Sequence, residues 1–317
     1  MFRATNENVR APSFPGRCHA SATFIGYEGA MAGTLADSGA MEDVLLPPRF
    51  TYASDELGRS GQRVVRLIEW ATGQPRIRRM YEHYTKRGRP PELFWHDAIA
   101  ELRLDLRLNR RPADAIPESG PLMMVANHPF GVVDGIILCW LVAQVRDDYQ
   151  IMTHRVLHQA PEVRSRILPV DFSGTEAAML NNLRSRRLAR ELLDKRGALL
   201  VFPGGGVAAA PKTFGRAVDR PWGPLAAKLA LTTGAAVLPV YFHGQNSRWF
   251  QAASNVHQTL RYALLFHEVR NKIGRSIAVT IGDVIAPERL RAFDDRNAVT
   301  QFLRQATHGL ADDAGAR

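Results

Sequence analysis

The chain of 317 residues has only two cysteines, no long apolar run and a shortage of acidic residues. Cys18 and Cys139 lie far apart in different contexts, so they form neither a disulfide framework nor a zinc cluster, and a reducing compartment is compatible with them. No stretch of about 18 consecutive apolar residues occurs, which excludes a conventional membrane-spanning helix. The first residues carry no apolar core behind their charges, so we expect no secretory signal.

Positive charge is what the sequence has in excess. Lys and Arg total 41 against 31 Asp and Glu, which gives a net charge of +10 in a chain whose hydrophobic content of 45% is that of an ordinary globular protein. A surplus of positive charge is informative about the binding partners of a protein and not about its fold. It predicts an anionic partner: nucleic acid, an acidic membrane surface, an acidic carrier protein or a phosphorylated substrate.

Composition divides the chain into three parts. Residues 1–48 are rich in Gly, Ala, Ser and Pro without a sustained period and are predicted to be a disordered tail. Residues 49–101 are predicted to be a basic amphipathic helical segment, followed by a folded domain over residues 102–310. Residues 59–111 hold 13 Lys and Arg against 6 Asp and Glu, so most of the net charge lies there.

The best-defined helix of the basic segment, residues 62–72, leaves two interpretations open. Val64, Val65 and Ile68 share one helical face, and Arg63 lies on the other. A basic helix with an apolar stripe and nearby aromatics is suited to a membrane interface. The same pattern is typical of a helix that packs on a protein core and exposes its arginines to solvent.

From residue 102 onward the chain alternates strand and helix patterns. Strands are expected at 102–108, 121–126, 149–153, 167–170, 198–202, 236–242 and 277–281, and helices at 133–145, 176–195, 222–233 and 287–307. This alternation predicts a three-layer α/β domain with a largely parallel central sheet, preceded by the basic helices. In such folds ligands bind beyond the carboxyl ends of the strands.

The segment after the strand at 121–126 combines a histidine with a carboxylate. His128 follows the strand directly and Asp134 comes six positions later, with Pro129 and Gly131 favouring a sharp turn between them. A histidine oriented by an acid is what a general base requires. No G-x-S-x-G sequence supplies a protein nucleophile, so the pair indicates a substrate hydroxyl as nucleophile. Alternatively, the two residues merely cap the strand and the helix.

A run of three glycines follows the strand at 198–202. Pro203 precedes Gly204, Gly205 and Gly206, whose backbone can approach an anion closely. Lys212 and Arg216 follow closely and are candidates for pairing with a phosphate. A plain flexible turn explains the glycine run equally well, because it matches neither G-x-G-x-x-G nor a Walker A sequence.

The remaining histidines give weaker signals. His243 follows the strand at 236–242, and a structural role is favoured over a second titrating group. His154 and His158 approach the spacing of helix-borne metal ligands, but Pro161 would interrupt that helix. We therefore expect no metal site.

Four sequence blocks together resemble the glycerolipid and lysophospholipid acyltransferase superfamily. They are N-H-P-F-G-x-x-D-G, L-P-V-D-F, V-F-P-G-G-G-V and L-P-V-Y-F-H-G-Q-N-S, in that order and each after or within an apolar strand. The likeness is greatest to the bacterial branch of hemolysin-like and lyso-ornithine-lipid acyltransferases, and it extends from about residue 50 to the last helix.

The resemblance implies roles for individual residues. His128 matches the catalytic base and Asp134 its orienting carboxylate. Phe202, Pro203 and Gly205 match the block that binds the phosphate or polar head of the acceptor, and Pro239 matches the final proline block. Asn127, Gly204, Gly206, Lys212 and Arg216 are further residues predicted to bind substrate. Two departures stand out: five residues rather than four separate the histidine from the aspartate, and Gly204 replaces the glutamate of the common F-P-E-G block.

The implied activity is transfer of a fatty acyl chain from acyl-CoA or acyl-carrier protein to the hydroxyl of a lyso-lipid. Such an enzyme needs no metal or redox cofactor and is expected in the cytoplasm, peripheral at the inner face of the cell membrane, with an anionic membrane surface as partner. The alternative is a non-catalytic basic protein that binds membranes or nucleic acid. Nucleic acid is the less favoured partner, because the sequence contains no recognised nucleic-acid-binding module.

Overall fold

The computed structural model describes residues 51, 58–154, 157, 160–211, 215–256 and 258–312. The tail predicted over residues 1–48 lies outside these residues, as does Lys212. Described residues from Leu46 onward belong to one compact unit.

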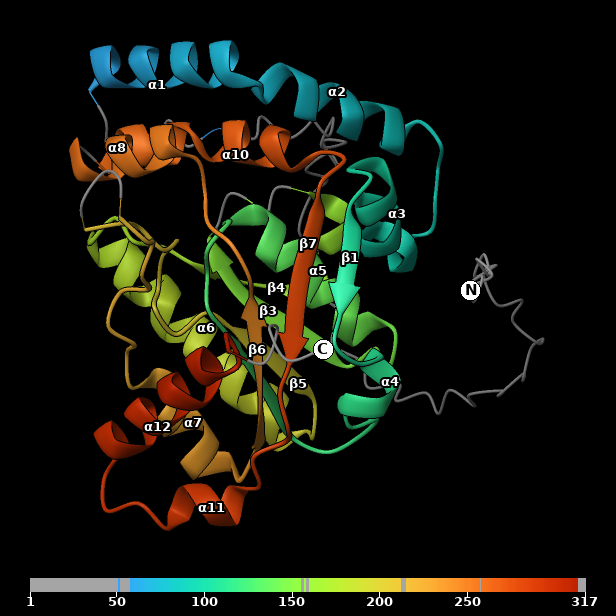
Figure 1. Cartoon of the computed structure of the whole chain (residues 1–317), viewed down its shortest axis with the longest axis vertical. Coiled ribbons are helices and arrows are strands. Elements are labelled where there is room, and N and C mark those ends of the chain that lie inside the picture. The colour runs from blue at the N-terminus through green and yellow to red at the C-terminus, as the bar shows by residue number, and fades with distance from the viewer. Residues whose placement is uncertain are drawn as a thin grey trace, which may run out of the picture. The chain divides into compact units, whose positions relative to one another are not determined.

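A seven-stranded sheet forms the centre of this unit (Figure 1). The strands are β1 (Asp105–Leu108), β2 (Leu122–Ala126), β3 (Tyr149–His154), β4 (Ile167–Val170), β5 (Ala198–Val201), β6 (Ala236–Phe242) and β7 (Ser276–Ile281). Their order in the sheet is β1-β7-β6-β2-β5-β3-β4, and every neighbouring pair is parallel except β6 with β7. The largely parallel α/β fold predicted from the sequence is therefore confirmed.

Helices cover both faces of the sheet and one of its ends. The α-helices are α1 (Arg59–Thr72), α2 (Gln74–Thr85), α3 (Phe94–Glu101), α4 (Pro112–Ala115), α5 (Val132–Ala143), α6 (Glu176–Asp194), α7 (Leu225–Thr233), α8 (Arg248–Val256), α9 (Gln258–Ala263), α10 (Leu265–Lys272), α11 (Pro287–Arg291) and α12 (Arg296–Gly309); η1 (Pro91–Leu93) and η3 (Pro161–Arg166) are 3-10 helices. Figure 1 shows α1 and α2 above α8 and α10 at the end of the sheet where the parallel strands finish.

The structure departs most clearly from the predicted elements between β6 and β7 and in the last helical segment. The segment between β6 and β7 contains α8, α9 and α10, for which no helices were predicted. These helices stay at the carboxyl end of β6, so the chain re-enters the sheet from that end and β7 runs antiparallel to β6 (Figure 1). The single helix predicted over 287–307 is two helices, because the Asp295 carboxylate accepts hydrogen bonds from the N–H groups of Asn297 and Ala298 and so starts α12 afresh.

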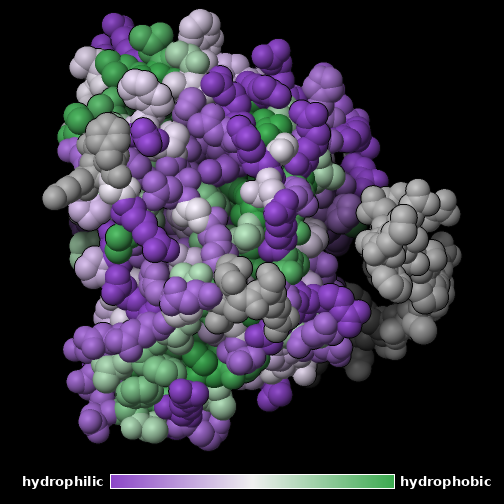
Figure 2. Space-filling model, viewed as in Figure 1, coloured by the Kyte–Doolittle hydropathy of each residue, from purple (hydrophilic) through white to green (hydrophobic). Residues whose placement is uncertain are grey.

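Helix α1 packs on α9 and α10 with one side and leaves apolar side chains exposed on the other. Val65 is fully buried, whereas Val64, Leu67 and Trp70 are 50%, 64% and 69% exposed. Figure 2 shows a mostly hydrophilic face on which hydrophobic residues gather in several places, one of them at the upper left, over α1 and α8. Within the described ranges, no helix combines the length and apolar character needed to cross a membrane.

The strands in the middle of the sheet are buried on both faces, as the alternation of β2 illustrates. Leu122, Met124 and Ala126 belong to one core cluster, and Met123 and Val125 belong to the cluster on the opposite face. Because helices cover both faces, the strand reads as a continuous apolar run rather than as an alternating one.

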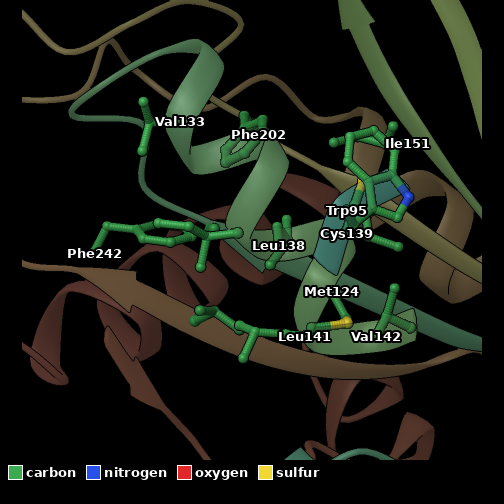
Figure 3. Packing of buried hydrophobic residues seen from close by; sticks show 14 of the residues in the cluster. Trp95, Met124, Val133, Leu138, Cys139, Leu141, Val142, Ile151, Phe202 and Phe242 are labelled. Carbon is green, nitrogen blue, oxygen red and sulfur yellow. The ribbon is translucent and has the colours of Figure 1, made fainter. Parts of the chain in front are cut away.

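Helix α5 lies at the centre of the first core cluster and follows β2 in the chain. Leu138, Leu141 and Val142 are fully buried, and Figure 3 shows them among side chains from the sheet such as Met124 and Ile151. Burying each of these aliphatic side chains contributes about 1.5 to 3 kcal/mol. This packing fixes the first turn of α5 relative to the carboxyl end of β2, where the sequence predicts a catalytic pair.

Candidate active site

The turn between β2 and α5 brings His128 and Asp134 into direct contact. The Nδ1 atom of His128 lies 2.9 Å from the Oδ2 atom of Asp134. The carboxylate is fully buried, while the histidine side chain keeps 16% of its surface exposed. With the ring proton on Nδ1 donated to Asp134, the Nε2 atom is left as the hydrogen-bond acceptor. The sequence spacing of five intervening residues is therefore compatible with a direct contact.

The same carboxylate oxygen organises the turn itself. Oδ2 of Asp134 accepts hydrogen bonds from the backbone N–H groups of Phe130 at 2.8 Å and Gly131 at 2.9 Å. Burial raises the pKa of the Asp134 carboxyl, and the hydrogen bonds from His128 and the two N–H groups act in the opposite direction. Its other oxygen, Oδ1, is buried and makes no hydrogen bond within the described residues.

Gly131 is required at this turn for two reasons. Its φ of +88° is a backbone conformation that residues with side chains rarely adopt. A Cβ atom at this position would also lie 3.0 Å from Leu265 Cδ2 and 3.2 Å from Val207 Cγ2. A larger residue here would therefore displace the two N–H groups that hold Asp134.

The glycine run predicted after β5 lies directly beside His128. The imidazole ring of His128 stacks on Phe202, with ring centroids 4.0 Å apart and an interplanar angle of 19°. The N–H of Ala208 donates a hydrogen bond of 2.7 Å to the carbonyl of His128. The strand ends of β2 and β5, which pair in parallel, thus bring two separate sequence blocks into one site.

A cleft of about 1400 Å³, measured out to its open mouth, runs past His128. One wall contains Phe202, Pro203, Gly205 and Gly206, and the other is formed by α6 and the end of β3. Among the described residues that line it, none is Asp, Glu, Ser or Cys, whereas Arg186 is one of them. The cleft therefore suits an anionic ligand, and neither a serine nor a cysteine nucleophile is available in its described walls.

Several residues predicted to bind substrate have other positions. The Asn127 side chain is buried, accepts a hydrogen bond from the N–H of Phe242 at 2.7 Å and donates one to its carbonyl at 2.9 Å, which ties β2 to β6. Pro239 is buried inside β6 opposite Val125 and does not line the cleft. The structure thus gives both residues a part in the scaffold.

Two further residues predicted to bind substrate, Gly204 and Arg216, do not line the cleft. Gly204 faces the segment after the run, because a Cβ on it would lie 3.5 Å from the Arg220 carbonyl oxygen. Arg216 is exposed. The pKa of His243 is lowered mainly by the burial of its own side chain and further by the positive charge of Arg216. His243 Nε2 lies 2.8 Å from Thr280 Oγ1 and is outside the cleft, in keeping with the structural role that the sequence favoured.

Asp219, which no sequence pattern indicated, holds the turn that contains His128. Its buried carboxylate accepts hydrogen bonds from the backbone N–H of His128 at 3.1 Å and from Trp222 Nε1 at 3.2 Å, and it lies 3.6 Å from His308 Nε2. Asp219 stands in a loop without a periodic pattern. Its proximity to His128 therefore appears only in three dimensions.

The chain is similar to a protein family, to a known enzyme and to a solved structure. A family model described as acyltransferase matches residues 87–316. The lyso-glycine lipid O-acyltransferase of Phocaeicola vulgatus is 21% identical over 214 residues, which cover 65% of this chain and 74% of that protein. The crystal structure of the 1-acyl-sn-glycerophosphate acyltransferase PlsC from Thermotoga maritima is 18% identical, with a TM-score of 0.46, and the match covers 72% of this chain and 79% of that one.

The turn that holds His128 and Asp134, at the carboxyl end of β2, is the candidate site for a group-transfer reaction. The family model spans most of the chain, and the chain belongs to the acyltransferase family. It is an acyltransferase, of the superfamily that its four sequence blocks resemble.

Proposed function

We propose that the protein transfers a fatty acyl chain from a thioester, acyl-CoA or acyl-carrier protein, to the hydroxyl of a lyso-lipid. One observation carries this proposal: His128, in contact with the buried Asp134, lines a cleft that shares part of its wall with an apolar pocket. The matched relative from Phocaeicola vulgatus, named as an O-acyltransferase of a lyso-lipid, supports the same class of acceptor.

The reaction uses His128 as general base. Its Nε2 atom removes the proton of the acceptor hydroxyl as the oxygen attacks the thioester carbonyl, and Asp134 stabilises the imidazolium that forms. When the tetrahedral intermediate collapses, the carbon–sulfur bond breaks and the imidazolium returns its proton to the departing thiolate. The products are the O-acyl ester and the free thiol, so no redox step or added cofactor enters the balance.

Backbone N–H groups of the glycine run are suited to the negative charge that develops in this reaction. The N–H groups of Gly204 and Gly206 donate no hydrogen bond to any residue in the described part of the chain. Phe202, which starts the run, is stacked on His128. Donors held rigidly beside a developing oxyanion stabilise the transition state, and removal of one such donor typically lowers kcat by about 10² to 10³-fold.

The transferred chain has a matching pocket. A cavity with about 1030 Å³ of empty space, measured out to its mouth, lies between α2, α3, α5 and α10 and is walled almost entirely by apolar and aromatic side chains. It shares Val132, Gly135, Thr153 and Leu157 with the cleft that contains His128. A fatty acyl chain inserted past α5 would therefore have its carbonyl at the His128 end.

An acyl-transfer assay tests both the activity and the pocket. The wild-type protein should acylate a lyso-lipid from acyl-CoA or acyl-carrier protein, supplied in separate arms with chains of 8 to 16 carbons. Ala98 lines the pocket from α3, so the variant Ala98→Phe should lose the longest donors selectively. If the ring excludes four methylenes at about 0.8 kcal/mol each, kcat/KM for the 16-carbon donor should fall about 200-fold relative to the shortest donor.

The matched control is Ala100→Phe, which makes the same change two residues along α3 at an exposed position outside the pocket. It should leave the chain-length profile unchanged. Equal losses for all donors in Ala98→Phe would show that this pocket does not hold the acyl chain. A wild-type protein that acylates no lyso-lipid with either donor would refute the activity.

We also propose that α1 holds the enzyme at the inner face of the cell membrane. Val64, Leu67 and Trp70 expose apolar surface, and the exposed Arg63 and Arg66 on the same helix form no ion pair with described residues. Near an anionic lipid surface each such arginine contributes about 1 kcal/mol of attraction. A helix that combines both features is suited to lying in the interface plane.

Sedimentation with phosphatidylglycerol vesicles tests this membrane surface. Binding should be lost in Leu67→Glu, and the control Val284→Glu, which alters an exposed apolar residue far along the chain, should bind as the wild type does. An oligonucleotide offered at the same salt concentration should not compete. Strong oligonucleotide binding with no vesicle binding would favour the nucleic-acid alternative instead.

A further inference from the structure

The cleft that contains His128 has apolar walls on both faces of the sheet. Phe202, Val207 and Leu265 line it and belong to the core cluster on the α5 face, where the apolar pocket also lies. Helices α6 and α7 cover the opposite face. On that face the cleft forms an α6–α7 groove, lined by Met152, Val170, Val201, Leu225 and Ala226. His128 therefore lies between two apolar regions, and the acyl chain proposed for the pocket occupies only one of them.

Phe172 extends the α6–α7 groove toward solvent. Its side chain lines the cleft and is 48% exposed, and its ring lies 6.1 Å from that of His154 with an interplanar angle of 19°. The backbone before it is fixed, because the Asn182 side chain accepts a hydrogen bond of 2.9 Å from the N–H of Asp171 and donates one of 2.7 Å to its carbonyl. A ring that is already held in place loses little conformational freedom when an apolar ligand covers it.

The same side of α6 continues the apolar surface beyond the groove. Asn182 and Arg186 line the cleft one helical turn apart, and Met179 and Leu183 share their face of the helix. Met179 and Leu183 are both exposed. Arg186 is exposed as well, so its charge stays in solvent while its methylene groups can cover apolar surface. A hydrocarbon chain that leaves the groove would therefore run along apolar atoms of α6.

The chemistry at His128 decides which substrate suits this groove. Donor and acceptor meet there, and the pocket on the α5 face takes the chain of the donor. The remainder of the donor is pantetheine, whose amide groups would lose hydrogen bonds to water among apolar side chains. The remainder of a lyso-lipid acceptor is its own hydrocarbon chain, which gains free energy by leaving water for an apolar wall.

We infer that the α6–α7 groove binds the hydrocarbon chain that the acceptor already carries, so that the enzyme selects single-chain lipids over small hydroxyl compounds. The inference rests on the proposed acyl transfer and adds a second chain-binding site to it. The chains of donor and acceptor then lie on opposite faces of the sheet, and the reacting atoms lie between them at His128.

Binding of two unreactive ligands tests the second site without acyl transfer. S-hexadecyl-coenzyme A is a thioether that cannot release its chain, and octyl-, decyl- and dodecylphosphocholine carry one chain and no acceptor hydroxyl. When the full-length protein is saturated with the thioether, isothermal titration calorimetry should show one further site for each phosphocholine below its micelle concentration. Affinity should rise about fourfold per added methylene. Displacement of the thioether by the phosphocholines, or equal affinity for all of them, would overturn the inference.

Two variants separate the groove from the pocket of the donor. Leu225→Trp adds volume inside the groove, and Phe172→Ser removes the half-exposed ring at its mouth, a change that should leave the fold intact. Both should weaken the binding of dodecylphosphocholine about tenfold, the equivalent of one to two methylenes, and leave the thioether unaffected. Ala98→Phe, which narrows the pocket, should weaken the thioether and leave dodecylphosphocholine unaffected.

Each groove variant has a matched control. Leu231→Trp makes the same change at a partly buried position of α7 outside the cleft, and Val284→Ser removes an exposed apolar side chain elsewhere. Both controls should bind dodecylphosphocholine as the wild type does. Equal affinity in Phe172→Ser and Val284→Ser would overturn the inference, even if Leu225→Trp fails to fold.

Steady-state kinetics then connect the groove to the reaction. In Phe172→Ser the KM of a lyso-lipid with a 16-carbon chain should rise about tenfold, whereas the KM of the donor and its chain-length profile should stay constant. A rise in the donor KM alone would overturn the inference. A protein that binds both unreactive ligands at once but transfers no acyl chain would instead refute the proposed function and leave the second chain-binding site standing.

Discussion

The variant His128→Ala should lose about 10² to 10⁴-fold in kcat for acyl transfer, the range that a positioned general base contributes. The ring is the only described group in contact with Asp134 that can take a proton from the acceptor. The fold should persist, because Asp134 keeps its two backbone hydrogen bonds and the ring stacks only on Phe202. Circular dichroism and thermal unfolding check the fold, and the transfer assay checks kcat.

The matched control for this variant is His96→Ala, which removes a histidine with 71% of its side chain exposed on α3. Its kcat should equal that of the wild type. Full activity in His128→Ala would contradict the assignment of the base, and the catalytic group would then have to be sought elsewhere in the cleft.

The variant Asp134→Asn should lower kcat by about 10 to 150-fold, less than the loss in His128→Ala. The amide oxygen can still accept hydrogen bonds from Phe130 and Gly131, so the turn keeps its geometry. What disappears is the negative charge that stabilises the imidazolium, and a hydrogen bond to a charged group is worth about 1.5 to 3 kcal/mol. The acceptor KM should stay constant because Asp134 is buried and does not line the cleft.

A structural role alone would give a different pattern, which Asp134→Ala reveals. The alanine variant also leaves two buried N–H groups without a partner, so its free energy of unfolding should fall by about 1 to 3 kcal/mol in addition to the loss of kcat. The control Asp114→Asn alters an aspartate with half of its side chain exposed, at the start of α4, and should change neither quantity. A normal kcat in Asp134→Asn would show that its charge plays no part in catalysis.

The alternation of apolar strands and amphipathic helices was enough to predict the parallel part of the sheet. It was not enough for β7, because parallel and antiparallel strands share the same two-residue period. The direction of β7 depends on where α8 to α10 return the chain, and those short helices, rich in polar residues, give no clear pattern. The break before α12 was missed for a similar reason. Asp295 is a residue type that often starts a helix, but the helical pattern continues on both sides of it.

The residues of the candidate site also include some that the sequence predicted and some that it did not. His128 and Asp134 were predicted because both stand in one short motif next to a strand end, and their contact depends on local geometry. Asp219 was missed because it reaches His128 from a distant segment, through a hydrogen bond to the backbone. Asn127 and Pro239 were placed with substrate by their motifs, whereas the packing of β2 against β6 occupies both.

The first turn of α5 positions Asp134 and also forms part of the pocket wall, and this limits which mutations can change the substrates of the enzyme. Asp134 points from that turn to His128, the proposed base, while Val132 and Gly135 on either side of it line the apolar pocket. Mutations here that reshape the pocket would also move the carboxylate. New chain-length preferences should therefore arise, in natural drift or in directed evolution, through the opposite wall at residues such as Met80 and Phe266, where a change in volume leaves the reacting groups undisturbed.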